Sequence, residues 1–340
     1  MKIKAICFRE TGIPEEVAHL EERQLPELKH NQVFVTQEVA CLNPADINLL
    51  EGKYGIRPEP FDSAQDRPKR RLPSIPGNEG VGVVTEVGNA VSRVRMGERV
   101  IAPGRIGSWC EGFVAEEESL VVVPREIPVE QATLLSINAP TAFRLLNDFV
   151  SLKPGDWIIQ NAANSAVGRF VVQIAHELGL KTVSVVRRKE LIPELKSLGA
   201  DVVVTDETPL SKQIKELTKG ASILLGLNAV GGDSAREIAK SLSPHGTLVT
   251  YGAMGREPLQ ISNALLIFKD LRFRGLWINE WFRLSSLDKI QDMYSKLIPW
   301  MKEGRLRAPI EKAYRLEDYK EAIKRAQEGG RKGKILFQIA

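Results

Sequence analysis

The stretch Asp156-Trp-Ile-Ile-Gln-Asn-Ala-Ala-Asn-Ser-Ala-Val-Gly168 gives the first indication of the fold of this chain. An apolar strand runs into a turn of small residues at 162–166, and this turn opens a helix with Gly168 in its first turn. Small side chains let a pyrophosphate approach the backbone, and a helix start offers it N–H groups and the positive end of a dipole. Asn164 and Ser165 stand where glycines are usual, so the motif is a degenerate form of the dinucleotide-binding fingerprint. Its position after a strand and before a helix predicts a dinucleotide site.

The segments after the turn alternate between helix-like and strand-like patterns. Apolar residues spaced three and four apart predict a helix directly after the turn, namely Val167, Phe170, Val171, Ile174, Ala175 and Leu178. Further strands are predicted at residues 182–186, 201–204, 223–227, 247–251 and 271–276, with helical stretches between most of them. Repeated strand–helix–strand units are typical of an α/β protein with a doubly wound parallel sheet. A last helix is predicted at about 287–302.

The first third of the chain has a different pattern. Segments such as 32–39 and 82–87 are rich in β-branched residues and bounded by turn residues, which predicts a β-rich domain. The final strand, at 335–339, is expected to return to this domain. The predicted division is therefore 1–128 with 304–340 for the β-rich domain, and 129–303 for the cofactor domain.

The second strand of the cofactor domain indicates which dinucleotide binds. It ends in Arg187-Arg188-Lys189, about 20 residues after the small-residue turn. An NAD enzyme usually has an acidic residue here for the ribose hydroxyls, whereas cations pair with a 2′-phosphate. The alternative is that these residues are solvated charges at a helix start, but three cations there oppose the helix dipole. The pattern favours NADPH.

Composition narrows the function classes. The 340 residues are 43% hydrophobic and 26% charged, as in a globular protein with more than one domain, and no apolar run reaches the roughly 18 residues that span a bilayer. A formal charge of +4 spread along the chain suits anionic small molecules and gives little support to nucleic-acid binding. The N-terminus reads directly into a strand, which predicts a cytoplasmic protein, or a mitochondrial-matrix protein if a leader has been removed. Three scattered cysteines, Cys7, Cys41 and Cys110, are predicted to be buried thiols.

The chain resembles the medium-chain dehydrogenase/reductase superfamily over nearly its whole length. Within that superfamily it is similar to the 2-enoyl thioester reductases of the mitochondrial fatty-acid synthesis type and their bacterial relatives. The motifs that carry the resemblance are Leu42-Asn-Pro-Ala-Asp-Ile-Asn48, Glu51-Gly-Lys-Tyr-Gly55, Gly77-Asn-Glu-Gly-Val-Gly82, Asn138-Ala-Pro-Thr-Ala-Phe143, Gln160-Asn-Ala-Ala-Asn-Ser165, Asn228-Ala-Val-Gly-Gly232, Leu266-Ile-Phe-Lys-Asp270 and Arg274-Gly-Leu-Trp277. The resemblance implies a GroES-like catalytic domain joined to a Rossmann cofactor domain.

The resemblance also implies the reaction. NADPH gives hydride to the β-carbon of a trans-2-enoyl thioester, and Tyr54, in the Gly-Lys-Tyr-Gly motif, stabilises the enolate oxygen or supplies a proton. A phenol suits this role because it is protonated at neutral pH and can donate. Asn43 and Asn78 replace the Cys and His ligands of zinc alcohol dehydrogenases, and Cys41 alone cannot build a zinc site, so a metal-free reductase is implied.

Carried over position by position, the resemblance implies two sets of binding residues. The cofactor set is Asn138, Asn164, Ser165, Ala166, Val167, Arg187, Arg188, Lys189, Tyr251, Gly252, Ala253, Met254, Leu276, Trp277, Ile278 and Lys334. The substrate-pocket candidates are Asn43, Phe268, Trp281 and Phe282. For the aromatic residues of the pocket set, plain core packing is an equally good interpretation.

Several alternatives and partners stay open. The implied partners are an enoyl thioester, carried by coenzyme A or by acyl carrier protein, and a second copy of the chain. A polar segment at 61–71 looks like an insertion; it is either a loop near the substrate mouth or a surface loop without a role. The nearest rival function is an NADPH quinone oxidoreductase or alkenal reductase, and a more distant one is a non-enzymatic NADPH-binding regulator.

Overall fold

The computed structural model describes residues 1–55, 58–59, 70–71, 74–105, 107–207 and 209–340. The chain forms two compact units: residues 1–137, 282–304 and 308–340 make the first unit, and 138–281 with 305–307 make the second. This division differs from the expected boundaries because segments 129–137 and 282–303 belong to the first unit. The Tyr294 hydroxyl, for example, donates to the Leu135 carbonyl at 2.9 Å within that unit.

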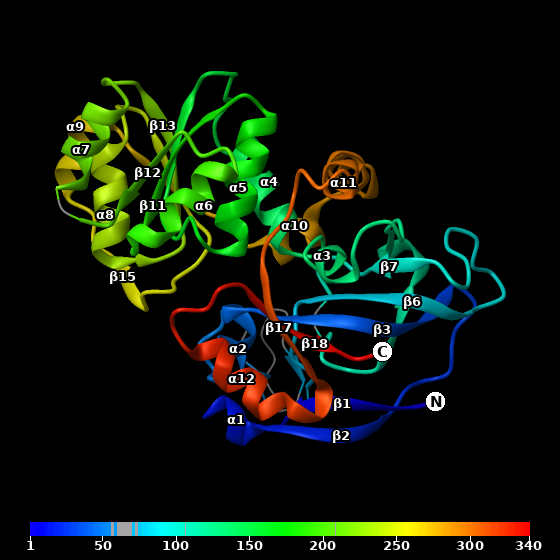
Figure 1. Cartoon of the computed structure of the whole chain (residues 1–340). Coiled ribbons are helices and arrows are strands. Elements are labelled where there is room, and N and C mark those ends of the chain that lie inside the picture. Colours follow the sequence, from blue (N-terminus) through cyan, green and yellow to red (C-terminus); the bar gives the residue numbers. More distant parts are fainter. Residues whose placement is uncertain (56–57, 60–69, 72–73, 106, 208) are drawn as a thin grey trace. The chain divides into compact units, whose positions relative to one another are not determined.

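The second unit contains the predicted parallel sheet (Figure 1). Its strand order is β12-β11-β10-β13-β14-β16, and every neighbouring pair is parallel. The strands are β10 (Trp157–Gln160), β11 (Lys181–Val186), β12 (Val202–Thr205), β13 (Ile223–Asn228), β14 (Thr247–Thr250) and β16 (Arg272–Gly275). The direction of winding reverses between β10 and β13, so the sheet has the switch point of a Rossmann fold. The predicted fold class is therefore confirmed for this unit.

Helices pack on both faces of this sheet. The helical segments that start in the second unit are α4 (Asn138–Asn147), α5 (Ala166–Glu177), η2 (Lys189–Leu191), α6 (Ile192–Ser197), α7 (Leu210–Leu217), α8 (Gly232–Ser241), α9 (Asn263–Lys269) and α10 (Ile278–Leu284), with a short strand β15 (Glu257–Leu259). One apolar core joins Ile159 to Ile214 and Ile238, and a separate core joins Val172 to Leu195. Two cores on one sheet are what a doubly wound arrangement requires.

The first unit is built on a second sheet, with strand order β17-β18-β3-β6-β7-β9 and β8 paired with β3. Its strands are β3 (Gln32–Leu42), β6 (Glu79–Val87), β7 (Arg99–Ile101), β8 (Gly112–Glu116), β9 (Val121–Val122), β17 (Ile310–Arg315) and β18 (Lys334–Gln338). Two further pairs are β1 (Lys2–Phe8) with β2 (Ala18–Gln24), and β4 (Pro58–Glu59) with β5 (Arg70–Arg71). The predicted return of the last strand is confirmed, because β18 pairs with β3.

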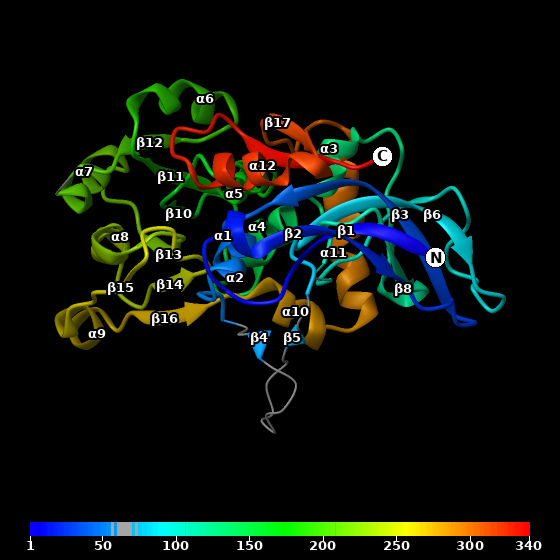
Figure 2. The ribbon, with the colours of Figure 1, turned by 90° about the horizontal axis from the view of Figure 1, so that it is seen from below.

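Helices α3 and α12 pack on strands of this sheet, and α12 lies beside β17 (Figure 2). The helical segments are α1 (Pro14–Val17), α2 (Pro44–Leu50), η1 (Glu117–Ser119), α3 (Val129–Thr133), α11 (Leu287–Lys302), η3 (Leu316–Asp318) and α12 (Tyr319–Gln327). The core includes Trp109, whose ring meets that of Phe337 edge-on with centroids 5.2 Å apart. The Trp109 ring N–H donates to the Cys41 carbonyl at 3.1 Å, so the buried indole is satisfied.

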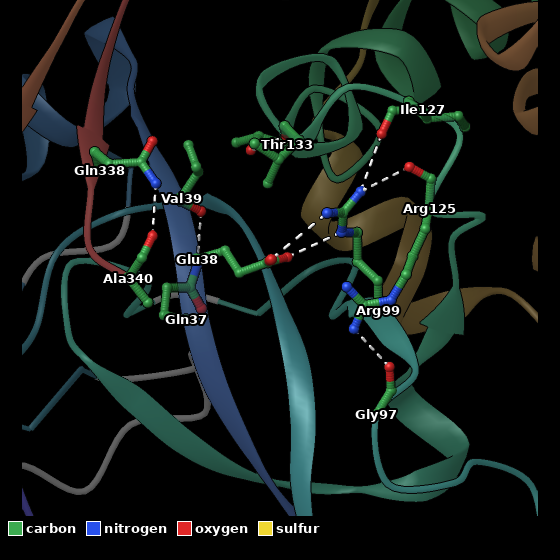
Figure 3. A network of polar contacts seen from close by, with 11 residues as sticks. Gln37, Glu38, Val39, Gly97, Arg99, Arg125, Ile127, Thr133, Gln338 and Ala340 are labelled. Carbon is green, nitrogen blue, oxygen red and sulfur yellow. Dashed lines mark hydrogen bonds and ion pairs between the residues drawn. The ribbon is translucent and has the colours of Figure 1, made fainter.

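An ion pair between Arg99 and Glu38 connects β7, β3 and the segment before α3 in the first unit (Figure 3). The Arg99 Nε on β7 donates to a Glu38 carboxylate oxygen on β3 at 2.9 Å, across the intervening strand β6. The same guanidinium donates to the Ile127 carbonyl at 3.0 Å, which holds the segment before α3. Both side chains are largely shielded from water, so this pair is worth more than an exposed one.

Three smaller predictions can be compared with the structure. All three cysteines are buried free thiols, as expected. Within the described ranges, no helix has both the length and the hydropathy needed to cross a bilayer. Most of the insertion predicted at 61–71 lies outside the described residues.

Candidate active site

The small-residue turn lies between β10 and α5, at the carboxyl edge of the parallel sheet. Ser165 is the N-cap of α5, and its hydroxyl oxygen accepts from the Gly168 N–H at 3.0 Å. The backbone of Ala162 adopts a positive φ of 47°, which turns the chain sharply out of the strand. Asn164, Ser165 and Val167 are half-buried, so the turn remains partly accessible.

Gly168 makes close packing possible at this turn. A Cβ at this position would lie 2.6 Å from the Ala163 carbonyl oxygen and 2.7 Å from that of Ala162. A separation below 3.0 Å between such atoms is sterically forbidden, so only glycine brings the helix start this close to the turn. Because Gly168 lets the start of α5 lie against the turn, the backbone N–H groups of the helix start can face a pyrophosphate.

Two buried asparagines join the turn to the neighbouring strand, and neither was among the predicted site residues. The Asn161 Nδ2 donates to the Asn228 Oδ1 at 2.9 Å, and the Ala229 N–H donates to the Asn161 Oδ1 at 2.8 Å. Asn228 Oδ1 also accepts from the N–H groups of Val230 and Gly231, each at 3.1 Å. The signal in the sequence was an asparagine after each of two apolar strands.

The predicted phosphate-binding cations follow β11, the strand next to β10 in the sheet. Arg187, Arg188 and Lys189 are all exposed. Lys189 has a 3.8 Å ion pair with Glu207, whereas Arg187 and Arg188 have no ion pair with any residue that the structure describes. Both guanidinium groups are thus available to a ligand anion at the edge where the small-residue turn lies.

The segment 251–254 follows β14 and packs on the loop after β13. The Met254 N–H donates to the Ala229 carbonyl at 2.9 Å, and a Cβ on Gly252 would lie 3.1 Å from that carbonyl oxygen. The Tyr251 hydroxyl is buried beside Ser165. Burial raises the pKa of Tyr251, and a hydrogen bond with Ser165 opposes the rise, so this hydroxyl is protonated at neutral pH.

Other predicted cofactor residues are more dispersed. Leu276 follows β16 and its N–H donates to the Thr250 carbonyl at 3.0 Å, so segment 276–278 also starts at the carboxyl edge. Asn138 is buried at the start of α4. Lys334 lies in the first unit, at the start of β18.

Tyr54 lies just beyond the end of α2 in the first unit. The N–H groups of Lys53 and Tyr54 both donate to the Asn48 carbonyl, at 2.8 and 3.0 Å. The half-buried ring packs against the main core of this unit. The backbone of the predicted catalytic residue is therefore held by the last turn of a helix.

The two asparagines at the zinc-ligand positions belong to a buried polar cluster. The Asn43 Nδ2 donates to Glu79 at 3.0 Å, the Lys334 Nζ donates to the Asn43 Oδ1 at 2.5 Å, and the Asn78 amide donates to Asp46. Burial raises the pKa of Asp46 to about 7, and Glu79 adds to the rise; the hydrogen bonds from Asn43 and Asn78 and the charge of Lys334 oppose it. Sequence reasoning did not single out Asp46 or Glu79.

This cluster does not fit a zinc ion. Amide side chains replace the soft ligands that zinc prefers, and those of Asn43 and Asn78 are already bound to carboxylates. Burial raises the pKa of the nearby Cys41 thiol far above its usual range, which opposes formation of a thiolate. In the described part of the chain, no three His, Cys, Asp or Glu side chains gather as metal ligands do.

The aromatic pocket candidates have different surroundings. Phe282 is buried in the first unit against the turn at Gly104, where an added Cβ would lie 3.0 Å from the Phe282 Cβ. In the second unit, the Arg144 guanidinium lies over the Trp281 ring, 4.5 Å from its centroid. Phe268 is 81% exposed on α9. That exposure does not suit a pocket wall within a single chain.

Comparison with known families supports both halves of this description. The model "Alcohol dehydrogenase GroES-like domain" matches residues 29–126, and the model "Zinc-binding dehydrogenase" matches residues 166–303. These matches confirm the predicted pair of a GroES-like and a Rossmann domain.

Individual proteins match nearly the whole chain. The mitochondrial enoyl-[acyl-carrier-protein] reductase of Rattus norvegicus is 40% identical over 327 residues, which cover 94% of this chain and 84% of the relative. A putative NADPH:quinone reductase from Bacillus thuringiensis has a TM-score of 0.90 at 29% identity, covering 99% of both chains. The Etr1p complex with NADP and crotonyl-CoA has a TM-score of 0.86 at 28% identity, covering 99% of this chain and all of the other.

The Gly168→Ala variant tests the small-residue turn. The new methyl group forces the start of α5 away from the turn, so we expect about a tenfold weaker affinity for NADPH, the result of about 1.4 kcal/mol of strain. Titration of NADPH fluorescence measures it. The control is Gly329→Ala, because no atom lies within 4 Å of a Cβ there. Equal affinities in the two variants would contradict the assignment.

Proposed function

We propose that this chain, which belongs to the mitochondrial enoyl-[acyl-carrier-protein] reductase family of the medium-chain dehydrogenases/reductases, reduces trans-2-enoyl thioesters to acyl thioesters. The chain is an oxidoreductase, and its cofactor is NADPH. When bound, NADPH supplies the hydride that is added to the β-carbon of the substrate. The chain's own residues must then bind the cofactor, stabilise the charge that develops on the thioester oxygen and deliver a proton to the α-carbon.

In this proposal the second unit holds the cofactor at the carboxyl edge of its sheet. The start of α5 faces the pyrophosphate with backbone N–H groups and the positive end of the helix dipole. Arg187 and Arg188 take the 2′-phosphate, because both are exposed and neither is neutralised by a described carboxylate in an ion pair. Tyr251, whose hydroxyl is buried beside Ser165, is proposed to border the cofactor site.

Tyr54 is the proposed catalytic residue. Its hydroxyl donates a hydrogen bond to the thioester oxygen as negative charge develops there, and the same hydroxyl is the candidate source of the proton for the α-carbon. The observation that carries this assignment is the attachment of the Tyr54 backbone to the C-terminal turn of α2. Such a residue is pre-oriented, which is what a transition-state donor requires.

We propose that the reaction needs no zinc. The supporting observation is that Asn43 and Asn78 bind Glu79 and Asp46 in place of a metal. Trp281 and Phe282 remain the proposed contacts of the acyl chain, and the carrier is coenzyme A or acyl carrier protein. Quinone reduction is the second candidate, favoured by the similarity to the Bacillus thuringiensis protein; it needs the same cofactor residues but no donor at Tyr54.

We also propose a homodimer formed through the edge of the cofactor-domain sheet. Strand β16 ends the six-stranded sheet, and it pairs with β14 on its other side. The preceding helix α9 exposes three large apolar side chains, Leu266, Ile267 and Phe268, of which Ile267 is 70% and Phe268 81% exposed. A second copy covering this patch explains the exposure of Phe268 better than a place in the acyl pocket.

Tyr54→Phe tests the reaction. We expect the variant to reduce trans-2-hexenoyl-CoA about 100 to 1,000 times more slowly than wild type, the usual cost of losing one donor to an oxyanion. NADPH oxidation at 340 nm measures it, with NADPH fluorescence as the control for cofactor binding and a simple quinone assayed in parallel. An unchanged enoyl reductase rate, or turnover of the quinone alone, would rule out the proposed mechanism.

Arg187→Ala tests the choice of cofactor. Loss of a charge-assisted hydrogen bond to the 2′-phosphate is expected to raise KM for NADPH about tenfold or more, with little change in KM for NADH. The matched control is Lys212→Ala, because Lys212 is an exposed cation on α7 of the same unit and is not among the predicted cofactor residues. If Arg187→Ala changed KM for NADPH and KM for NADH by the same factor, Arg187 would not be the residue that recognises the 2′-phosphate.

Phe268→Glu tests the dimer. A charge in the centre of a covered apolar patch is expected to give a monomer at micromolar concentration where wild type is a dimer, as measured by sedimentation velocity. The control is Leu284→Glu, an exposed apolar residue on α10. If wild type is itself a monomer, or the Phe268 variant remains a dimer, α9 is not the interface.

A further inference from the structure

The buried polar cluster of Asn43, Asp46, Asn78, Glu79 and Lys334 is assembled by three neighbouring strands of the first unit. Asn43 directly follows β3, Glu79 begins β6 and Lys334 begins β18. The ladder registers bring these ends together, because Cys41 pairs with Glu79 and Leu42 pairs with Ile335. Asn43, Asp46, Asn78 and Glu79 are each less than one-tenth exposed. Polar groups at this depth need hydrogen-bond partners.

Asn43 is the hub of this cluster. Its Oδ1 accepts from the Lys334 Nζ at 2.5 Å, and its Nδ2 donates to the Glu79 carboxylate at 3.0 Å. The other carboxylate oxygen of Glu79 accepts from the Ile137 N–H at 3.0 Å, so the acid is fixed on both sides. Both ends of the Asn43 amide are engaged with protein groups. Asn43 therefore holds Lys334 and Glu79 in place.

Asp46 links the same cluster to α2. Its Oδ2 accepts from the Asn43 N–H at 2.8 Å, and the Asn43 side chain caps the helix in return, which makes a capping box. The Asn78 amide holds the other oxygen of Asp46. Two neutral donors thus fix this buried carboxylate, and through it the first turn of α2.

The far end of α2 carries Tyr54. The helix is seven residues long, and the Asn48 carbonyl in its last turn accepts from the N–H groups of both Lys53 and Tyr54. Gly52, with a φ of +72°, makes the turn between the end of α2 and Lys53. Because the Asn48 carbonyl of this two-turn helix holds the backbone of Tyr54, we expect a shift of the helix start to move Tyr54 as well.

We propose that the Asn43–Asp46–Asn78–Glu79 cluster is a positioning framework with two arms, one that fixes the side chain of Lys334, a predicted cofactor residue, and one that sets the position of Tyr54 through α2. None of these four residues is itself catalytic. This inference rests on the proposed function for the role of Tyr54, but the arm that ends at Lys334 concerns cofactor binding alone. The two arms can therefore be measured separately.

The first experiment is a double-mutant cycle on NADPH affinity with the full chain, using Asn43→Ser and Lys334→Met. Serine is as good an N-cap as asparagine, so the helix keeps its cap while the hub contacts are lost. We expect each single variant to weaken NADPH binding about tenfold in a fluorescence titration, and the double variant to be no weaker than Lys334→Met. Effects that multiply to about a hundredfold would overturn this arm.

The second experiment is a double-mutant cycle that measures kcat with trans-2-hexenoyl-CoA, using the variants Asn78→Ala and Tyr54→Phe. We expect Asn78→Ala to lower kcat about tenfold in the wild-type background and to have no further effect in the Tyr54→Phe background. A merely structural role for Asn78 would lower the rate in both backgrounds, which would overturn this arm. Should Asn78→Ala fail to fold, Asn43→Ser replaces it in the same cycle with the same criteria.

These outcomes are distinguishable from failure of the proposed function. If wild type does not reduce enoyl thioesters, the proposed function fails, and the NADPH titrations still decide whether Asn43 orients Lys334. If wild type is active and both cycles are additive, the function stands and the framework does not.

Discussion

The arrangement of the cofactor site depends on one constraint, the parallel hydrogen bonding of the sheet in the second unit. Parallel strands end at the same edge, so the segments after β10, β11, β14 and β16 all start there. The buried amide pair of Asn161 and Asn228 then joins the two strands at the switch point. Each such bond contributes about 1 kcal/mol net, but leaving either amide unpaired would cost about 1–3 kcal/mol, so the pair specifies the geometry more than it adds stability.

The first unit solves a related problem with different groups. Two buried carboxylates, Asp46 and Glu79, are unfavourable in a dry interior unless donors surround them. Here the side-chain amides of Asn43 and Asn78 and the backbone N–H groups of Asn43 and Ile137 supply those donors, and Lys334 donates to the Asn43 amide oxygen. These hydrogen bonds offset the cost of burial, and the cluster includes the start of the helix that leads to Tyr54.

The predictions from sequence were most accurate where a local pattern carried them. The strands of the cofactor domain were predicted within a residue or two because each is a short apolar run bounded by turn residues. The surroundings of the aromatic pocket candidates were harder to predict. Phe268, Trp281 and Phe282 look alike in sequence, yet the structure places Phe268 in solvent, Trp281 under an arginine and Phe282 in the core. Their surroundings depend on which element packs against them, and no local pattern encodes that.

Local sequence patterns were enough for the doubly wound sheet, the dinucleotide turn and the preference for NADPH, since strand, turn, helix and the cations after the second strand are close together in the chain. Local patterns could not predict the polar cluster around Asn43. Its hydrogen bonds join Asn43 to Glu79, 36 residues away, and to Lys334, 291 residues away. Such pairs form only when β3, β6 and β18 align in one register, and that register is a property of the whole sheet and not of any segment of it.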